Sequence, residues 1–323
     1  MVNLTTNYMG LELKNPIIVG SCDLTNSVEK LKKLEKAGAA AVVLKSIFED
    51  QIMSEARSMQ GISSHTEEYD YINRYIRANN LSDYINLIKK AKKEVDIPII
   101  ASINCSTPSE WVNYIKKIQQ SGADAIELNI FIIPGNVEID GRQMEQTYYD
   151  ILKKVNTVSR IPVSIKMSYY FSGLANFLAE LNTLRLDGLV LFNRFYRPDI
   201  DIEKLEFTAR SPYSRSDELS LPLRWIGILA DKIETDFVAS TGVHNGEDVI
   251  KCLLAGAKAT EVVSVLYKKS LDEIKKMLSF ISGWLEKNKY NSISDIIGKM
   301  SQSNLKDPSL YERAQFMKYF HER

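Results

Sequence analysis

Short apolar runs alternate with longer amphipathic stretches along most of this 323-residue chain. Eight runs have strand length and are apolar on both faces, which is typical of buried parallel strands. They are Ile17–Gly20, Ala41–Lys45, Pro98–Ser102, Ala125–Asn129, Pro162–Lys166, Gly188–Phe192, Asp236–Ser240 and Ala259–Val263. Helical periodicity between them predicts helices at Val28–Ala37, Leu81–Glu94, Ser109–Ser121, Gln143–Val158, Leu174–Leu184, Leu223–Lys232 and Asp248–Ala255.

The residues that connect these elements support the prediction that strands and helices alternate. Gly38, Gly122 and Gly256 each follow a predicted helix, where a left-handed C-cap favours glycine. Pro98 and Pro162 stand at strand entrances, where proline is tolerated. Eight strand–helix units in series predict an α/β protein with a TIM (β/α)₈ barrel, as one domain over residues 1–323. An open doubly wound sheet is the alternative, but it rarely needs eight evenly spaced strands.

Four segments depart from the repeat. Residues 1–16 predict a hairpin of Leu4–Tyr8 and Leu11–Leu13 that closes the bottom of the barrel. Long insertions follow the second strand, at 46–80, and the sixth strand, at 193–222. Such loops at the C-terminal ends of barrel strands are where substrate contacts belong. The tail, residues 288–323, predicts two short outer helices.

Bulk composition argues against several classes of partner. Lys+Arg and Asp+Glu are both 41, so the net charge of zero favours neither nucleic acid nor an anionic membrane. The three cysteines show neither a disulfide framework nor metal-ligand spacing, so we expect no metal and a reducing, cytoplasmic location. The N-terminus lacks the features of a signal peptide, and no apolar run approaches the ~20 residues of a membrane span.

Two predicted strands end in lysine, Lys45 and Lys166. A cation at the end of a buried strand is costly unless something pairs with it. One explanation is that each side chain reaches solvent along its apolar stem. The other is that both lysines point at one bound anion.

The remaining strand ends are also polar. In a barrel, all these side chains converge on one mouth, which predicts a polar ligand there. The set comprises Ser21, Cys22, Lys45, Ser46, Ser102, Asn104, Asn129, Lys166, Asn193, Thr241, Gly242 and Ser264.

Six stretches resemble, in order and spacing, motifs of the dihydroorotate dehydrogenase family over about residues 10–270. They are Asn15–Ser21, Val43–Ser46, Glu127–Ile130, Pro162–Lys166, Asp187–Asn193 and Thr241–Ala257. Two further runs, Phe192–Tyr196 and Leu223–Ile226, are most similar to a branch called dihydroorotate dehydrogenase-like proteins.

The resemblance implies FMN at the barrel mouth. Lys45 and Lys166 would flank the isoalloxazine, where a cation stabilises the anionic reduced flavin. Ser21 and Ser46 would contact the ring, and Asn129 and Asn193 would lie over its face. Gly242 and Ser264 would hold the phosphate, as barrels do after strands seven and eight. Asn104 and Thr241 complete the expected cofactor set.

The proton-transfer residue departs from the family pattern. Family members carry Cys or Ser after strand four, whereas this chain has Phe131, Ile132 and Ile133. A positioned base typically contributes ~10²–10⁴-fold to such a reaction. His65 is a candidate replacement, with an exposed loop histidine as the alternative interpretation. We therefore assign Lys45, Asn129, Asn193 and His65 as candidate catalytic residues.

Several other candidate site residues have two possible interpretations each. Arg194 and Arg197 either clamp a substrate carboxylate or form ion pairs with Asp199 or Asp201. Cys105 either faces the pocket or is a buried structural thiol. His244 either assists the phosphate or lies at the surface. Trp225 and the aromatic run Tyr169–Phe171 are either a cofactor wall or helix-packing residues.

Three functional hypotheses follow. The first is an FMN-dependent oxidoreductase acting on a CH–CH bond beside a carbonyl, nominally dihydroorotate oxidation in pyrimidine biosynthesis, on a small molecule for which a carboxylate is one option. The second is a flavin-binding module without dihydroorotate turnover. The third is an aldolase that uses Lys166 as a Schiff-base amine. The resemblance to the cytosolic branch also implies a homodimer.

Overall fold

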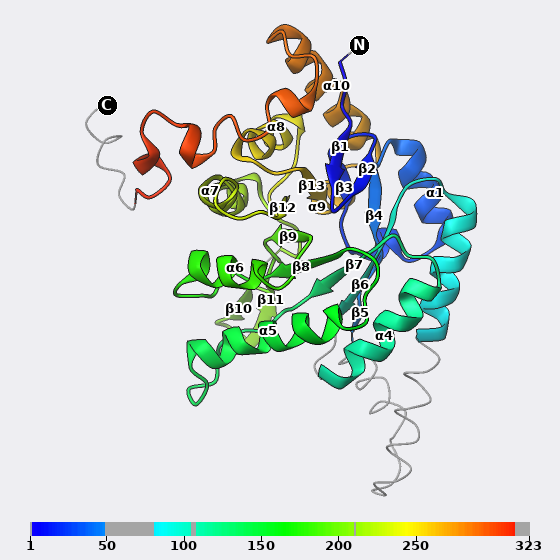
Figure 1. The fold of residues 1–323 in the computed structure, drawn as a ribbon, viewed down its shortest axis with the longest axis vertical. Coiled ribbons are helices and arrows are strands. Elements are labelled where there is room, and N and C mark those ends of the chain that lie inside the picture. Colours follow the sequence, from blue (N-terminus) through cyan, green and yellow to red (C-terminus); the bar gives the residue numbers. More distant parts are fainter. Residues whose placement is uncertain (1, 49–80, 105–107, 210, 314–323) are drawn as a thin grey trace, which may run out of the picture.

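A closed barrel of eight parallel strands forms the centre of the computed structural model, which describes residues 2–48, 81–104, 108–209 and 211–313 (Figure 1). Every strand pairs in parallel with its neighbours, and the β4–β6 pairing completes the ring. The predicted TIM barrel is therefore confirmed. The strands are β3 (Ile17–Val19), β4 (Ala41–Val43), β6 (Ile99–Asn104), β7 (Ala125–Asn129), β8 (Val163–Met167), β9 (Gly188–Leu191), β12 (Asp236–Ser240) and β13 (Ala259–Val262), with β5 (Ile47–Phe48) added beside β6.

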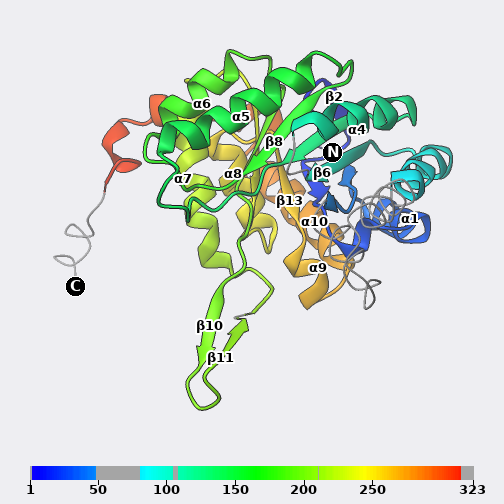
Figure 2. The ribbon, with the colours of Figure 1, turned by 90° about the horizontal axis from the view of Figure 1, so that it is seen from below.

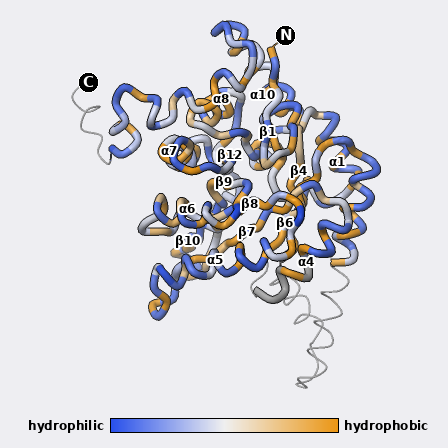
Figure 3. Tube along the Cα trace, in the orientation of Figure 1, coloured by the Kyte–Doolittle hydropathy of each residue, from blue (hydrophilic) through white to orange (hydrophobic). Residues whose placement is uncertain are grey.

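Helices surround the barrel and shield the outward faces of its strands (Figures 1 and 2). All seven predicted helices are present, although α7 begins at Ser220 rather than Leu223. Their residues alternate between hydrophilic and hydrophobic along each helix (Figure 3), as expected where one face covers a sheet. The helices are α1 (Val28–Ala37), residues 81–94, α4 (Pro108–Gln120), α5 (Gly141–Asn156), α6 (Leu174–Asn182), α7 (Ser220–Leu229) and α8 (Gly246–Ala255), followed by the unpredicted α9 (Ser264–Lys268) and α10 (Asp272–Lys287).

The predicted N-terminal hairpin closes the bottom of the barrel. Its strands are β1 (Thr6–Tyr8) and β2 (Leu11–Leu13), and Tyr8, Met9 and Leu13 pack into a buried cluster with the inward residues of the barrel strands. A Cβ on Gly188 would lie 2.7 Å from the Tyr8 hydroxyl, so β9 needs glycine where the hairpin approaches it.

The insertion after the sixth barrel strand is confirmed and forms an antiparallel hairpin. Its strands, β10 (Pro198–Asp201) and β11 (Glu206–Ala209), project away from the barrel (Figure 2), and η2 (Ser216–Leu219) returns the chain to α7. Leu205 and Phe207 on this hairpin are more than four-fifths exposed, at 85% and 83%. Of the insertion after the second strand, only residues 46–48 belong to the described part of the chain.

The described part of the tail, 288–313, differs from the predicted pair of short helices. It contains three single-turn 3₁₀ segments instead, η3 (Ile293–Asp295), η4 (Gln302–Asn304) and η5 (Pro308–Leu310). Gly298, at a positive φ of 75°, and Pro308 interrupt this stretch, which limits each helical turn to a few residues. Across the ranges that the structure describes, no helix combines the length and apolar content needed to cross a membrane.

Candidate active site

A connected set of polar side chains lies at the C-terminal mouth of the barrel. The Ser46 hydroxyl lies 3.0 Å from that of Ser21 and 2.7 Å from that of Ser102. Asn129 approaches the Ser46 hydroxyl at 3.5 Å, and the Asn193 amide donates to Asn129 Oδ1 at 2.5 Å. These residues come from five different strands or strand ends, as the convergence of strand ends predicted.

A cavity of about 390 Å³ opens beside this set, within the usual size of small-molecule sites. Six of the predicted site residues line it together: Ser21, Lys45, Ser46, Asn129, Lys166 and Asn193. Cys22, Asp23, Phe131, Arg194 and Tyr267 complete its wall. Both lysines therefore face one cavity, although each also has a carboxylate partner within the protein.

Lys45 lies beyond the last hydrogen-bonded residue of β4 and reaches toward solvent. Its Nζ contacts Asp23 Oδ1 at 2.6 Å, and the two side chains are 42% and 62% exposed. The lysine lowers the pKa of Asp23, first by hydrogen bonding and then by its charge. An exposed ion pair of this kind holds its partners loosely.

Lys166 lies within β8 and points into the barrel. Its Nζ contacts Glu261 Oε2 at 2.5 Å, and both side chains are buried. Glu127, which is only 1% exposed, interacts electrostatically with both of them. Two carboxyl groups and one amine thus share a buried site, and its amine, Lys166, also lines the 390 Å³ cavity.

Burial and charge set the protonation of this buried cluster. Burial, reinforced by the charge of Glu261, raises the pKa of Glu127 well above its usual value. Burial alone would lower the pKa of Lys166, but the charges of Glu261 and Glu127 outweigh it and raise that pKa. The cluster consequently holds a protonated amine beside two buried carboxyl groups, and burial disfavours the charged form of Glu127.

The residues expected to hold a phosphate are engaged with the segment that precedes α7. Ser214 donates its backbone N–H to Ser264 Oγ at 2.9 Å, and its hydroxyl lies 2.9 Å from His244 Nε2. A Cβ on Gly242 would lie 2.3 Å from the backbone nitrogen of Leu219. Neither Gly242 nor Ser264 lines the 390 Å³ cavity, so their assignment to phosphate stays a prediction.

Two other residues of the expected cofactor set lie at strand ends. Thr241, at the mouth end of β12, donates its hydroxyl to the carbonyl of Phe192 at 3.0 Å. Asn104 is the half-buried last residue of β6 and stands opposite Phe48 in the β5–β6 register. His65 and Cys105 lie outside the described residues.

The loop after β7 brings an aromatic ring to the cavity, in the stretch where the resemblance implies a proton-transfer residue. Phe131 lines the cavity and stacks on Phe195, with ring centroids 4.2 Å apart. Ile132 packs against the outer core, which is the cluster of buried apolar residues between the barrel strands and the surrounding helices, and Ile133 is exposed. None of the three side chains can accept a proton, as the sequence indicated.

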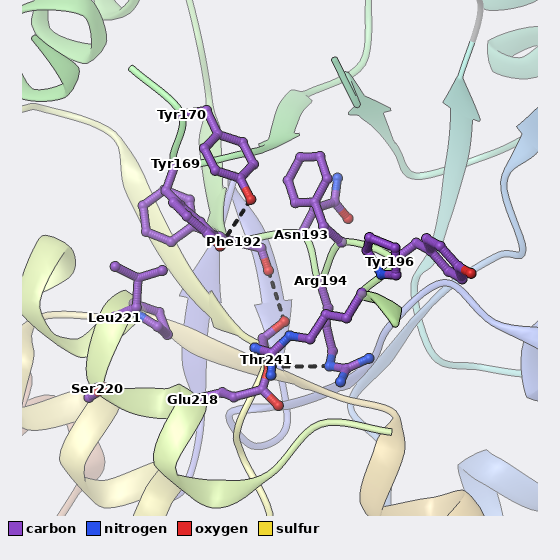
Figure 4. Close-up of a pocket in the computed structure, with 14 residues that line it drawn as sticks. Tyr169, Tyr170, Phe192, Asn193, Arg194, Tyr196, Glu218, Ser220, Leu221 and Thr241 are labelled. Atoms are coloured by element: carbon purple, nitrogen blue, oxygen red, sulfur yellow. Dashed lines mark hydrogen bonds and ion pairs between the residues drawn. The ribbon is translucent and has the colours of Figure 1, made fainter. Parts of the chain in front are cut away.

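A second cavity, of about 440 Å³, adjoins the first and is shown in Figure 4. Arg194 and Arg197 both contact Glu218 Oε2 there, at 3.2 Å and 2.6 Å, a partner that the sequence did not suggest. Tyr169 and Tyr170 line this cavity, whereas Phe171 stacks on Phe177 and Trp225 packs against the outer core.

Sequence reasoning missed Glu261, Glu127 and Tyr267. The two glutamates interrupt apolar strands just as the lysines do, so the cost of burying a charge could have identified them. Tyr267 had no comparable signal, because it reaches the cavity from α9, a five-residue helix that the periodicity did not reveal.

The fold and the mouth define a TIM barrel with a cavity lined by amide, hydroxyl and lysine side chains. A model of the family described as dihydroorotate dehydrogenase matches residues 3–283. The chain belongs to that family.

Similar proteins of known name belong to the same family. The dihydroorotate dehydrogenase B (NAD(+)) catalytic subunits of Pyrococcus abyssi and Methanocaldococcus jannaschii are 26% and 27% identical, each over 91% of this chain and 98% or 97% of their own length. A putative dihydroorotate dehydrogenase A (fumarate) of Aeropyrum pernix is 24% identical over 91% of this chain and 96% of its own. Membership implies an oxidoreductase.

Proposed function

We propose that the protein is an FMN-dependent oxidoreductase that acts on a carbon–carbon bond beside a carbonyl group. The observation that carries the proposal is the convergence of Lys45, Lys166, Asn129 and Asn193 on one cavity at the mouth of a family barrel. FMN, when bound, would accept or supply the hydride. The nominal substrate is dihydroorotate, and the absence of the usual base favours a different small molecule.

The side chains at the cavity fit the ring end of a flavin. Hydroxyls of Ser21 and Ser46 and the amides of Asn129 and Asn193 supply donors and acceptors for ring carbonyls and nitrogens. Lys45 and Lys166 supply positive charge beside the ring, which tunes a flavin. At the phosphate end, Ser214 holds Ser264 and His244, so phosphate binding there requires Ser214 to exchange its partners.

Each residue of this chain would then have a distinct task. The Asn129–Asn193 pair would orient the substrate over the ring, because its hydrogen bond fixes both amides. Phe131 would exclude water from the substrate face without moving a proton. The proton would have to come from outside the loop after β7, and His65 is the candidate that the sequence offers.

The aldolase hypothesis is disfavoured by the state of Lys166. A Schiff-base lysine must lose its proton to attack a carbonyl, and its pKa is usually depressed for that purpose. Here the carboxylates of Glu261 and Glu127 raise the pKa of Lys166 instead. The second candidate, flavin binding without turnover, is favoured by Phe131 and remains the alternative.

A visible spectrum of the purified protein tests the proposal. We expect a flavin band, and slow bleaching or none with anaerobic dihydroorotate, followed by assays with NAD(+) and fumarate as acceptors. Lys166→Ala should lower the flavin content. No flavin band, even after FMN is added, would refute the cofactor assignment. A stable band with every carbonyl-conjugated substrate would favour the non-catalytic alternative.

Phe131→Cys tests whether the missing base limits dihydroorotate turnover, because Phe131 is the residue of this loop that lines the cavity. A thiol at this position is expected to accelerate flavin reduction by dihydroorotate by ~10²–10⁴-fold. Phe131→Ala is the matched control, because it removes the same side chain without adding a proton acceptor. Equal rates in both variants would show that something other than the base prevents turnover.

The expected homodimer and cytoplasmic location stay predictions. Exposed apolar side chains on the β10–β11 hairpin, Ile200, Ile202, Leu205 and Phe207, support a contact between copies. Sedimentation equilibrium of the full chain should give a dimer, and Phe207→Asp should shift it toward monomer. A monomer at micromolar concentration would contradict the expectation.

A further inference from the structure

The 440 Å³ cavity is a second chamber beside the proposed flavin cavity. Both cavities include Asn193 and Arg194 in their walls. The stacked pair Phe131–Phe195 contributes one ring to each, Phe131 to the first and Phe195 to the second. A ligand in the second chamber would therefore lie next to the first without entering it.

Aromatic rings form one wall of the second chamber. The Tyr170 ring meets Phe195 edge-on with centroids 5.0 Å apart, and it lies tilted against Tyr169 at 4.5 Å. Tyr169 in turn packs edge-on against the buried Phe192 at 5.8 Å. Phe192 and Phe195 are buried and hold the wall in place, whereas Tyr170 remains 42% exposed. A rigid wall with one accessible aromatic face suits a planar ring, which stacks on or meets it edge-on.

The opposite side of the chamber carries excess positive charge. Figure 4 shows Tyr169 and Tyr170 on one side and Glu218 on the other. Glu218 is the shared partner of two cations, Arg194 and Arg197, so one positive charge is not neutralised within this trio.

The two arginines differ in the donors they have left. Arg194 also donates to the carbonyls of Pro212 and Ser211, both at 3.0 Å, which fixes its guanidinium. Arg197 is 47% exposed, and among the described residues it donates a side-chain hydrogen bond to Glu218 alone. A guanidinium has five N–H donors in a planar fork, so Arg197 retains donors for a carboxylate.

We propose that this chamber is a binding site for a planar aromatic carboxylate, with its ring against Tyr170 and Phe195 and its carboxylate on Arg197. The site uses no atom of a cofactor, so it stands independently of the proposed FMN chemistry. Its shared wall places the bound ring next to the proposed flavin cavity, on the far side of Phe131.

Calorimetric titration of the full chain with trans-cinnamate tests the proposal, with and without added FMN. Cinnamyl alcohol is the matched probe, since it keeps the ring and lacks the charge. We expect cinnamate to bind about tenfold or more tightly than the alcohol, as one charge-assisted contact allows. Arg197→Gln should remove this preference and leave alcohol binding unchanged.

Arg215→Gln is the control variant, because Arg215 is 73% exposed, pairs with Asp217 and lines neither cavity. It should bind both probes as the unaltered protein does. Leu221→Trp, which fills the chamber from α7, should abolish both, with a thermal melt to verify folding. Absence of cinnamate binding at millimolar concentration, or binding that Arg197→Gln and Leu221→Trp both leave intact, would overturn the proposal.

Discussion

Lys45 and Lys166 follow the same sequence pattern but have opposite environments. Lys45 stands two positions past the end of β4 and pairs with the exposed Asp23. Lys166 is the fourth residue of the five-residue β8 and pairs inside the barrel with Glu261. Because strand side chains alternate between faces, position within the ladder decides whether a lysine meets solvent or the interior. A lysine at the end of an apolar run can therefore be either an exposed surface cation or a buried ion-pair partner, and the apolar run alone does not distinguish the two.

Removing the buried cation should have the largest effect. Lys166→Met leaves the Glu261 carboxylate buried without its partner, which typically costs about 3–5 kcal/mol of stability. Urea unfolding monitored by circular dichroism measures this loss. The double variant Lys166→Met/Glu261→Gln should recover most of it, since no unpaired charge remains. A double variant as unstable as the single one would show that packing, rather than the ion pair, explains the loss.

The raised pKa of Glu127 should make stability depend on pH. The pKa of Glu127 is raised in the folded protein, so the folded state keeps a proton that the unfolded chain releases above about pH 4.3. Stability due to this group is full below that pH and falls as pH rises toward the folded pKa, by up to about 1.4 kcal/mol per pH unit.

Glu127→Gln, which keeps the shape and cannot ionise, should remove that slope. Urea midpoints measured from pH 5 to pH 8 should show the variant gaining on the unaltered protein as pH rises. Lys166 does not interfere, because its raised pKa affects stability only above about pH 10. A constant difference between the two proteins across this range would contradict a raised pKa of Glu127 in the folded protein.

Removing the exposed cation should have the smallest effect on stability. Lys45→Met breaks a surface pair and should cost less than about 1 kcal/mol. If Lys45 flanks the flavin, the same variant should weaken FMN binding about tenfold, the value of one 1.4 kcal/mol contact. Fluorescence titration with FMN measures this, and Asp23→Asn is the control that breaks the pair while keeping the cation. Equal FMN affinity in Lys45→Met and the unaltered protein would assign Lys45 to the surface alone.

The barrel itself could be predicted because its signals are local. Runs such as Ala125–Asn129 and Asp236–Ser240 have the observed bounds, since strands buried on both faces must be apolar throughout. The short helix α9 and the three 3₁₀ turns of the tail could not be predicted in the same way, because elements this short contain too few residues to show a helical periodicity. The positions of Ser21, Ser46, Asn129 and Asn193 around one mouth followed directly from parallel strands.

The sequence by itself determined the order of strands along the chain and the polar character of the strand ends, because each rests on residues close together in sequence. The number of strands favoured a barrel over an open sheet, and the pairing of β3 with β13 closes it. Only the tertiary structure decided which charges meet. Lys166 and Glu261 lie 95 positions apart on β8 and β13, which are not adjacent in the barrel. Their contact arises because both side chains point inward at the same height across the barrel. The tertiary structure also decided that Ser214 hydrogen-bonds to Ser264 and that Glu218 pairs with both Arg194 and Arg197. These residues belong to loops after different strands, which meet only at the mouth.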